Sequence, residues 1–280
     1  ELIDRLTFRN FLNYPDQLPD AKTIWHFREL LTKTGTDKTL WKAIWKQFNN
    51  KGIKVKNGTI QDATFITSDP GHGNYKKDKG DPMKYLDQET VTQPAENKDG
   101  NKTGESPPKT NKKKEENKNK GRGADAKTRR SRDGTWAKKN DTLYFGYKLH
   151  TLVSGKSSMI INYSVTTASD HDSKIDLSIP GSVVYRDKGY YGVEPRGIDG
   201  TMDKKVKGED KLPIASIRRN LRISKKRSIV ERPYAVIKSV FHGGHVLVTT
   251  VIRVRVKAMF MCLAHNLNIL LSMQKRGLIA

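Results

Sequence analysis

The sequence of 280 residues is poor in cysteine: it contains one, Cys262, which excludes a disulfide bond within the chain. A single cysteine is typical of proteins in a reducing compartment. Because Cys262 lies in an apolar run, we interpret it as a buried, unreactive thiol. The sequence also lacks a signal-peptide pattern and any apolar stretch of roughly 18 residues, the length that a membrane-spanning helix needs. We therefore expect a soluble, intracellular protein.

Acidic residues are scarce as well. The chain has 30 Asp and Glu against 53 Lys and Arg, which gives a formal net charge of +23 and an isoelectric point near 9.9. Such a charge favours a polyanionic partner, most simply nucleic acid, although it says nothing about the fold. The first residue is Glu1 rather than methionine, and it falls within a helical pattern, so we expect further residues upstream.

The sequence predicts three regions. Residues 1–56 have apolar side chains at helical spacing, which predicts a helical N-terminal region for DNA binding or assembly. Asp20 is expected to cap a helix over residues 21–33 whose apolar stripe is Ile24, Phe27, Leu30 and Leu31, and Trp41 and Trp45 of the next helix are expected in the core. Residues 72–135 are rich in Lys, Asn, Gly, Glu and Pro and nearly lack aliphatic side chains, so we expect a basic, disordered insertion. Residues 57–71 and 136–280 carry strand and helix patterns on both sides of this insertion, and we expect them to form one interrupted α/β domain.

Within this domain the order is strand, hairpin, helix, strand, strand, helix. The segment "DHDSKIDLSIPG" is expected to be a turn that leads into a short helix, and residues 254–273 a long core helix. The expected strands are residues 58–66, 142–153, 158–169, the segment that begins "SVVY" at residue 182, and residues 211–217. The second and third of these are joined by "SGKS", which predicts a hairpin.

Three carboxylates stand out from the segments that carry them. Asp62 lies inside an otherwise apolar strand, where aspartate is depleted. Asp187 directly follows the buried strand "VVY", at the carboxyl end, where open α/β sheets place ligands. Glu231 lies in "RSIVERPYAVIK", a helical pattern with Arg227, Tyr234 and Lys238 on the same face.

Three acids from separate elements of a cationic chain indicate a site for hard cations. Mg²⁺ takes oxygen ligands and leaves room for phosphate oxygens of a substrate. Two such ions can activate an attacking oxygen and stabilise a leaving one during phosphoryl transfer. We therefore expect the carboxylates to cluster within roughly 10 Å of one another around a two-metal site.

The blocks "GTIQDATFI", "SVVYRDKGYYG" and "RSIVERPYAVIK" resemble the three signature blocks of DDE-type insertion-sequence transposases. The most similar group is insertion sequence family five, a near relative of family four. The resemblance implies a ribonuclease-H-like mixed sheet flanked by helices, with Asp62, Asp187 and Glu231 as catalytic metal ligands. In the related signature Tyr-x2-Arg-x3-Glu-x6-Lys, the first position is Ser224 here, so no catalytic role is assigned to it.

The family resemblance also implies an activity and its partners. It implies cleavage of DNA at the ends of the element, followed by transfer of the 3′-hydroxyl into target DNA. Two Mg²⁺ ions are expected as cofactors, with Mn²⁺ as a substitute, and Arg227, Lys238 and Lys188 are the expected DNA contacts. A homodimer in the active complex and a cytoplasmic, nucleoid-associated location in a prokaryote are expected, with no membrane partner. Two other functions stay open: a degenerate DNA-binding protein and a ribonuclease-H-like nuclease that only hydrolyses.

Each site residue also has a structural alternative. Ser228 and Glu231 have the spacing of a capping box, although Pro233 disfavours a helix start at Ser228. Asp62 could be a buried structural aspartate paired with a cation, and Asp187 a turn residue. Arg227 and Lys238 could form surface ion pairs with Glu231 or a neighbour. Four further side chains are expected to have structural roles: His150 and His171 in hydrogen bonds, and Trp136 and Tyr144 in packing.

Overall fold

The computed structural model describes residues 5–53, 55, 58–70, 131, 133–205, 208 and 211–278. The chain divides into two compact units, of which the first comprises residues 1–69 and 131–280. The second, residues 70–130, lies outside the described residues except for Pro70. The predicted insertion, residues 72–135, therefore falls almost wholly outside the described part of the chain.

Two of the three N-terminal helices, α1 (Leu6–Phe11) and α2 (Ala21–Thr34), bury little apolar surface. As predicted, Asp20 caps α2, because its carboxylate accepts a hydrogen bond from the Thr23 N–H at 2.6 Å. Of the apolar stripe expected along α2, Leu31 alone is buried. The other three stripe residues are exposed by about half their area: Ile24, Phe27 and Leu30.

The third N-terminal helix, α3 (Asp37–Asn50), belongs to the core. Its tryptophans Trp41 and Trp45 are buried, as predicted. Their indole N–H groups donate to the carbonyls of Ile161 at 2.9 Å and Ile160 at 3.1 Å. These two bonds hold α3 against the sheet.

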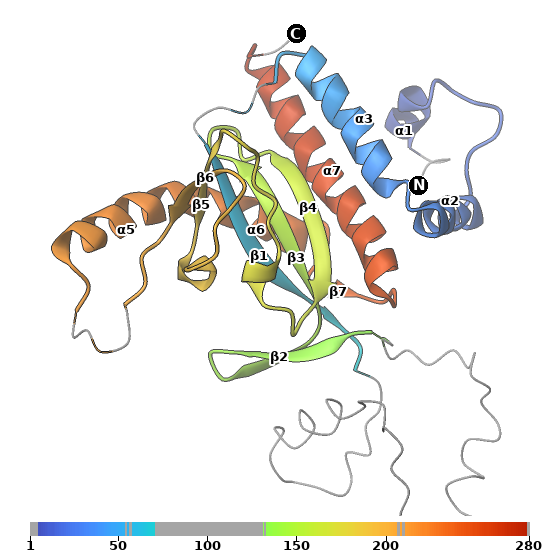
Figure 1. Cartoon of the computed structure of the whole chain (residues 1–280). Coiled ribbons are helices and arrows are strands. Elements are labelled where there is room, and N and C mark those ends of the chain that lie inside the picture. The colour runs from blue at the N-terminus through green and yellow to red at the C-terminus, as the bar shows by residue number, and fades with distance from the viewer. Residues whose placement is uncertain are drawn as a thin grey trace, which may run out of the picture. The chain divides into compact units, whose positions relative to one another are not determined.

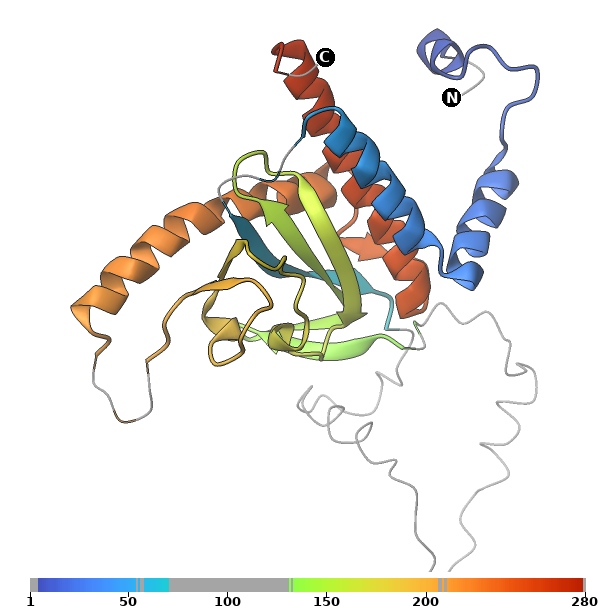
Figure 2. The same cartoon turned by 45° about the horizontal axis from the view of Figure 1, so that its top comes forward.

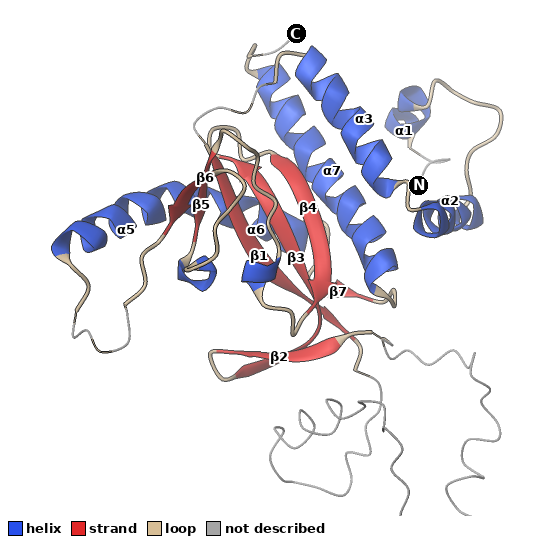
Figure 3. Ribbon diagram, in the orientation of Figure 1, coloured by secondary structure: helices blue, strands red, loops and turns tan. Residues whose placement is uncertain are grey.

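The sheet has seven strands within the described residues, with the long strand β1 at its centre (Figure 1). β1 pairs antiparallel with β3 and parallel with β5, β4 continues beyond β3, and β6 continues beyond β5. The strands are β1 (Thr59–Ser68), β2 (Thr135–Lys139), β3 (Thr142–Ser154), β4 (Ile160–Thr167), β5 (Val183–Arg186), β6 (Ile198–Thr201) and β7 (His245–Val246). The order β4-β3-β1-β5-β6 is a mixed sheet flanked by helices (Figure 3), compatible with the predicted ribonuclease-H-like fold.

The main core lies between one face of the sheet and the helices α3, α6 (Glu231–Ser239) and α7 (Val251–Lys275). α3 and α7 run side by side (Figure 2). By length and composition α7 could cross a membrane, and it is the one described helix that could. Its apolar character has another cause, because Val254, Met259 and Cys262 are fully buried in this core. The expected core helix and the buried thiol are therefore confirmed.

Two sequence predictions were wrong. Residues 211–217 do not form a strand: the helix α5 (Ile214–Arg227) begins there, directly after Pro213, whose fixed φ and missing N–H suit a helix start. The last of the expected strands is instead β6, which lies earlier in the chain. Its sequence "IDGT" is too short and too polar to show a strand pattern. The short helix expected after residue 170 is a single 3₁₀ turn, η2 (Asp172–Lys174), because the following residues bond individually rather than as a helix.

The segment that carries Glu231 is helical, but it is not one uniform helix. α5 ends at Arg227, the 3₁₀ turn η4 covers Ser228–Val230, and α6 starts at Glu231. Pro233 explains the tighter turn, because a proline cannot donate an N–H and its ring clashes with the carbonyl four residues earlier. Glu231 therefore stands at the first position of α6, directly after an irregular turn.

Candidate active site

Asp62 lies on the central strand β1 at the point where its parallel neighbour, β5, ends. β5 pairs with β1 at Thr59 and Ile60, and β7 pairs with β1 at Thr67 and Ser68. Asp62 lies between these two pairings, beyond the end of β5. Its backbone carbonyl accepts a hydrogen bond from the Tyr234 hydroxyl of α6, at 2.6 Å. The gap beside β1 is thus where the sheet and the Glu231 helix meet.

Asp187 lies next to Asp62 by strand register. Ile60 pairs with Tyr185 across the parallel strands, and Asp62 and Asp187 lie two positions beyond this pair. The charge of Asp187 raises the pKa of Asp62, so the two carboxylates lie near each other. The Asp187 carboxylate accepts a hydrogen bond from the Gly189 N–H at 2.8 Å and caps the 3₁₀ turn η3 (Lys188–Tyr190). The turn role is therefore present, and it is compatible with a second role in binding.

The carboxylate of Asp62 is poorly compensated. Its side chain is 23% exposed, and its ion-pair partner is Arg227, at 3.5 Å from Nη2 to Oδ1. Burial raises the pKa of Asp62 to about 6; Arg227 opposes this shift, and the charges of Asp187 and Asp172 add to it. Folding thus holds a carboxylate in a place where its charged form is costly.

Glu231 is exposed and has no hydrogen bond or ion pair among the described residues. Its helical neighbours point toward Asp62: Arg227, four residues earlier, contacts the carboxylate, and Tyr234, three residues later, contacts the backbone. Glu231 thus lies in the sequence between two residues that contact Asp62. Even so, no three His, Cys, Asp or Glu side chains in the described ranges are close enough together to hold a metal ion.

The capping-box alternative for Glu231 is wrong. The Ser228 hydroxyl donates to the Lys225 carbonyl at 2.9 Å instead of accepting from the backbone of α6. The Ser228 N–H donates to the Ser224 carbonyl, so it does not bond Glu231. Because the preceding helix runs directly into η4, the N–H groups that a capping box would satisfy already have partners.

The cations proposed from the sequence lie in different environments. Arg227 pairs with Asp62 rather than with Glu231, and its buried Nε has no hydrogen-bond partner. Lys238 is exposed at the end of α6, and partial burial together with the charge of Lys139 lowers its pKa. Lys188 is exposed on η3, directly after Asp187. The surface pairs expected as an alternative for Arg227 and Lys238 with Glu231 do not form.

The two histidines have the structural roles expected of them. His150 is fully buried, and its Nε2 shares a hydrogen bond with the Thr166 hydroxyl at 2.8 Å. Burial lowers the pKa of His150 to about 4, so the ring is neutral at pH 7. His171 caps η2, because its Nδ1 accepts a hydrogen bond from the Ser173 N–H at 3.3 Å, and the same nitrogen lies 2.7 Å from Ser173 Oγ.

The two aromatic side chains pack, as expected. The ring of Tyr144 stacks on Phe65 with centroids 4.6 Å apart, and the Trp136 ring lies 5.2 Å from that of Phe145. Neither observation suggests contact with a base.

Sequence reasoning missed a further acid, Asp172. It lies on η2, which contacts η3, and it forms an ion pair with Lys148 at 2.9 Å. Its charge raises the pKa of Asp62. The pKa of Tyr190 is raised mainly by burial, and the charge of Asp172 is the next largest cause. The sequence predicts a turn at "DHDS". The two acids in this segment, beside the end of a strand, could have indicated that it lies near the candidate site.

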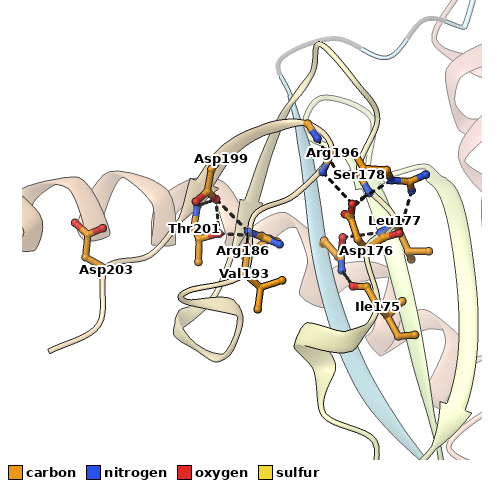
Figure 4. A network of polar contacts seen from close by, with 12 residues as sticks. Ile175, Asp176, Leu177, Ser178, Arg186, Val193, Arg196, Asp199, Thr201 and Asp203 are labelled. Atoms are coloured by element: carbon orange, nitrogen blue, oxygen red, sulfur yellow. Dashed lines mark hydrogen bonds and ion pairs between the residues drawn. The ribbon is translucent and has the colours of Figure 1, made fainter. Parts of the chain in front are cut away.

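A network of polar contacts fixes the loops before and after β5 (Figure 4). Arg186 is 1% exposed and donates to Thr201 Oγ1 at 2.8 Å, to the Val193 carbonyl at 2.5 Å and to Asp199 at 3.2 Å. It thereby ties the loop after Asp187 to β6. Sequence reasoning could not find this residue, because a charged side chain on a strand is expected to face solvent.

The second half of the network holds the loop before β5. Asp176 accepts hydrogen bonds from the Ser178 N–H at 2.9 Å and from the backbone and guanidinium of Arg196 (Figure 4). Burial raises the pKa of Asp176, but these hydrogen bonds outweigh it and lower the pKa to about 2. Both loops that border the carboxylate pair are therefore held by arginines.

We expect Arg186→Met to lower the free energy of unfolding by about 3 kcal/mol, because it leaves the Val193 carbonyl and Thr201 hydroxyl without their donor. Arg196→Met is the matched control: this arginine is 62% exposed, so its loss should cost about 1 kcal/mol or less. Urea unfolding of both variants measures the difference. Equal losses would show that Arg186 does not hold the loop.

The sequence matches the family described as Transposase DDE domain over residues 54–267. The transposase for insertion sequence element IS1106 of Neisseria meningitidis serogroup B is 27% identical over 150 residues, covering 49% of this chain and 51% of that protein. The chain thus spans about half the length of this curated relative. No solved structure gives a significant match.

Proposed function

Since the chain belongs to the family of transposase DDE domains, we propose that it cuts DNA at the ends of an insertion sequence and joins the freed 3′-hydroxyl to target DNA. The observation that carries the proposal is the under-compensated carboxylate of Asp62 beside that of Asp187. A fold that only needed stability would avoid this arrangement, because it costs free energy.

Another buried aspartate shows what full compensation looks like in the same fold. Asp37 is 0% exposed and accepts two hydrogen bonds from Arg255, at 2.8 Å and 2.9 Å. The Tyr163 hydroxyl donates a third, at 3.2 Å. Asp62 has one ion-pair contact, at 3.5 Å. The difference supports a role for Asp62 toward something that is not part of the chain.

The donor set fits a hard divalent cation. Asp62 and Asp187 supply carboxylate oxygens from neighbouring strands, and Mg²⁺ is commonly bound by one or two carboxylates together with substrate phosphates. We propose these two as ligands, with Glu231 as a third that joins them when DNA is bound. When bound, the divalent metal, proposed as a pair of Mg²⁺ ions with Mn²⁺ as a substitute, would supply activation of the attacking oxygen and stabilisation of the leaving oxygen.

The side chains of this site have distinct proposed tasks. Arg227 balances Asp62 in the free protein and would turn to a DNA phosphate once the carboxylate has another cation. Lys188 and Lys238 are proposed phosphate contacts on either side, since both are exposed. Tyr234 joins Asp62 to α6 and so keeps the Glu231 helix in register with β1.

We further propose features that follow from the family. The chain is assigned to insertion sequence family five, and two element ends are held by at least a homodimer during strand transfer. The basic segment 72–135 is proposed to add sequence-independent DNA affinity, because its lysines would release counterions from phosphates. The protein would act in the cytoplasm, on the nucleoid.

The experiment uses the purified full chain and DNA that contains its gene with flanking sequence on both sides. We expect cut ends and joined products in Mg²⁺, fewer or altered products in Mn²⁺, and neither class in a chelator. Cut ends without joined products would point to the hydrolytic nuclease. DNA binding without either product would point to the degenerate binding protein and would contradict the proposal.

A further inference from the structure

The helix that leads into the candidate site is strongly cationic. α5 contains no acidic residue within "IASIRRNLRISKKR". Its cationic side chains are Arg218, Arg219, Arg222, Lys225, Lys226 and Arg227. A helix of this composition repels itself electrostatically, so the arrangement needs an explanation in terms of what surrounds it.

One half of these cations anchors the helix to the body of the protein. Arg219 donates to Asp203 at 2.9 Å, and Lys226 donates to the Tyr185 hydroxyl at 2.6 Å. Asn220 adds two hydrogen bonds with the backbone of Asp203, at 2.8 Å and 2.9 Å. Arg227 contacts Asp62. This face of α5 is therefore fixed against β5 and the loop after β6.

The other half forms a stripe on the opposite face, which we call the α5 stripe: Arg218, Arg222 and Lys225. They are four and three positions apart, so they share one side of the helix. All three are exposed, and none of their side chains has a hydrogen bond or ion pair within the described part of the chain. α5 extends beyond the β6 edge of the sheet (Figure 1; Figure 2).

The α5 stripe is continuous with the candidate site. The same helix ends at Arg227, whose guanidinium contacts Asp62. At 1.5 Å per residue, the nine positions from Arg218 to Arg227 span roughly 14 Å, or about four base pairs of duplex at 3.4 Å each. A polyanion that entered the site along this helix would meet the stripe first and Arg227 last.

We propose that the α5 stripe binds the phosphate backbone of the DNA duplex next to the bond that reacts. The choice of DNA as the partner rests on the proposed function. The location rests on two observations: the stripe is positively charged, as a phosphate backbone requires of its partner, and it is continuous with the candidate site. It assigns three side chains to duplex binding outside the carboxylate site and the segment 72–135. The contacts would be to phosphates and therefore independent of base sequence.

The test compares two triple variants with equal loss of charge. The first is Arg218→Gln with Arg222→Gln and Lys225→Gln. The matched control is Lys156→Gln with Lys275→Gln and Arg276→Gln, three exposed cations at the β3–β4 turn and the end of α7 whose side chains have no ion pair within the described residues. Affinity for a duplex is measured at several salt concentrations. We expect the slope of log affinity against log salt to fall by about 3 in the first variant, since each phosphate contact contributes about 0.9, and to stay unchanged in the control.

Further measurements separate the remaining explanations. A variant with Arg218→Lys and Arg222→Lys should keep the parental slope, and thermal unfolding should be the same in all variants. Equal slopes in the two triple variants would overturn the proposal. The proposal would also be overturned if the first triple variant lost binding to phosphatidylserine vesicles while its DNA salt slope stayed at the parental value. A membrane surface would then fit the stripe better, because Leu221 and Ile214 beside it are exposed. A parent that binds DNA through the stripe but neither cuts nor joins it would contradict the proposed function and leave this inference standing.

Discussion

Replacing Asp62 with asparagine is expected to abolish DNA cleavage and, at the same time, to raise the free energy of unfolding of the metal-free protein at pH 8. Cleavage should fall by a factor of 10³ or more, because a neutral amide holds a divalent cation poorly. The stability gain follows from the pKa of Asp62, which burial raises to about 6 in the folded protein from its ordinary value of 3.8. Chemical unfolding at several pH values and cleavage in Mg²⁺ measure the two effects.

The direction of the pH dependence follows from linkage. Because the folded protein binds the Asp62 proton more tightly than the unfolded chain does, the associated stability is complete below about pH 4. It is lost as the pH rises through 6. Asparagine does not titrate, so the advantage of the variant should grow between pH 4 and 7 and then level off, at roughly 2–3 kcal/mol. Added Mg²⁺ should stabilise the parent more than the variant.

Asp37→Asn is the matched control for this prediction. Asp37 is buried as a bidentate partner of Arg255, so its replacement should lower the free energy of unfolding by about 3–5 kcal/mol. The two buried aspartates should therefore respond with opposite signs at pH 8. A loss of stability in Asp62→Asn at both pH 5 and pH 8 would make Asp62 a structural carboxylate and contradict the proposed site.

Elements with a strong local pattern were predictable. The sequence predicted strands at β1, β3 and β4, and the structure has them, with Ile60, Leu149 and Ile160 buried in the main core. The same regularity made Asp62 visible, because an aspartate inside such a strand interrupts it. The four-three-four spacing around Glu231 likewise predicted a shared face, and two of its members contact Asp62.

Elements that depend on tertiary contacts were not predictable. β6 is four residues long and is held by its pairing with β5 and by the buried guanidinium of Arg186, which no local pattern reveals. The apolar stripe of α2 predicted burial, but α7 covers it only in part: Leu31 is buried and the ring of Phe27 lies 6.4 Å from that of Phe260, while Ile24 and Leu30 stay about half exposed. Arg227 was expected at a DNA phosphate or a surface ion pair, and it contacts Asp62 because the 3₁₀ turn before α6 brings it there.

The position of Glu231 leads to the second large effect. We expect Glu231→Gln to lower cleavage by a factor of about 10³ or more and to leave the free energy of unfolding unchanged within about 0.5 kcal/mol. The side chain is exposed and has no partner among the described residues, so the folded protein loses no contact. DNA affinity without metal should stay the same or rise slightly, because one negative charge near the phosphates is gone. Cleavage of DNA containing the element ends, with thermal unfolding run in parallel, measures both.

Glu194→Gln is the control, because Glu194 is likewise exposed and without a hydrogen bond or ion pair in the described ranges. It has the same chemistry but lies outside the segment whose Arg227 and Tyr234 contact Asp62, so cleavage should stay at the parental rate. Near-parental cleavage by Glu231→Gln would remove Glu231 from the proposed ligands and leave Asp62 and Asp187 as a two-carboxylate site. Loss of cleavage in Glu231→Gln alone, with stability intact, would mean that an exposed and unpaired glutamate acts only in the DNA complex, where its helix has closed on the carboxylate pair.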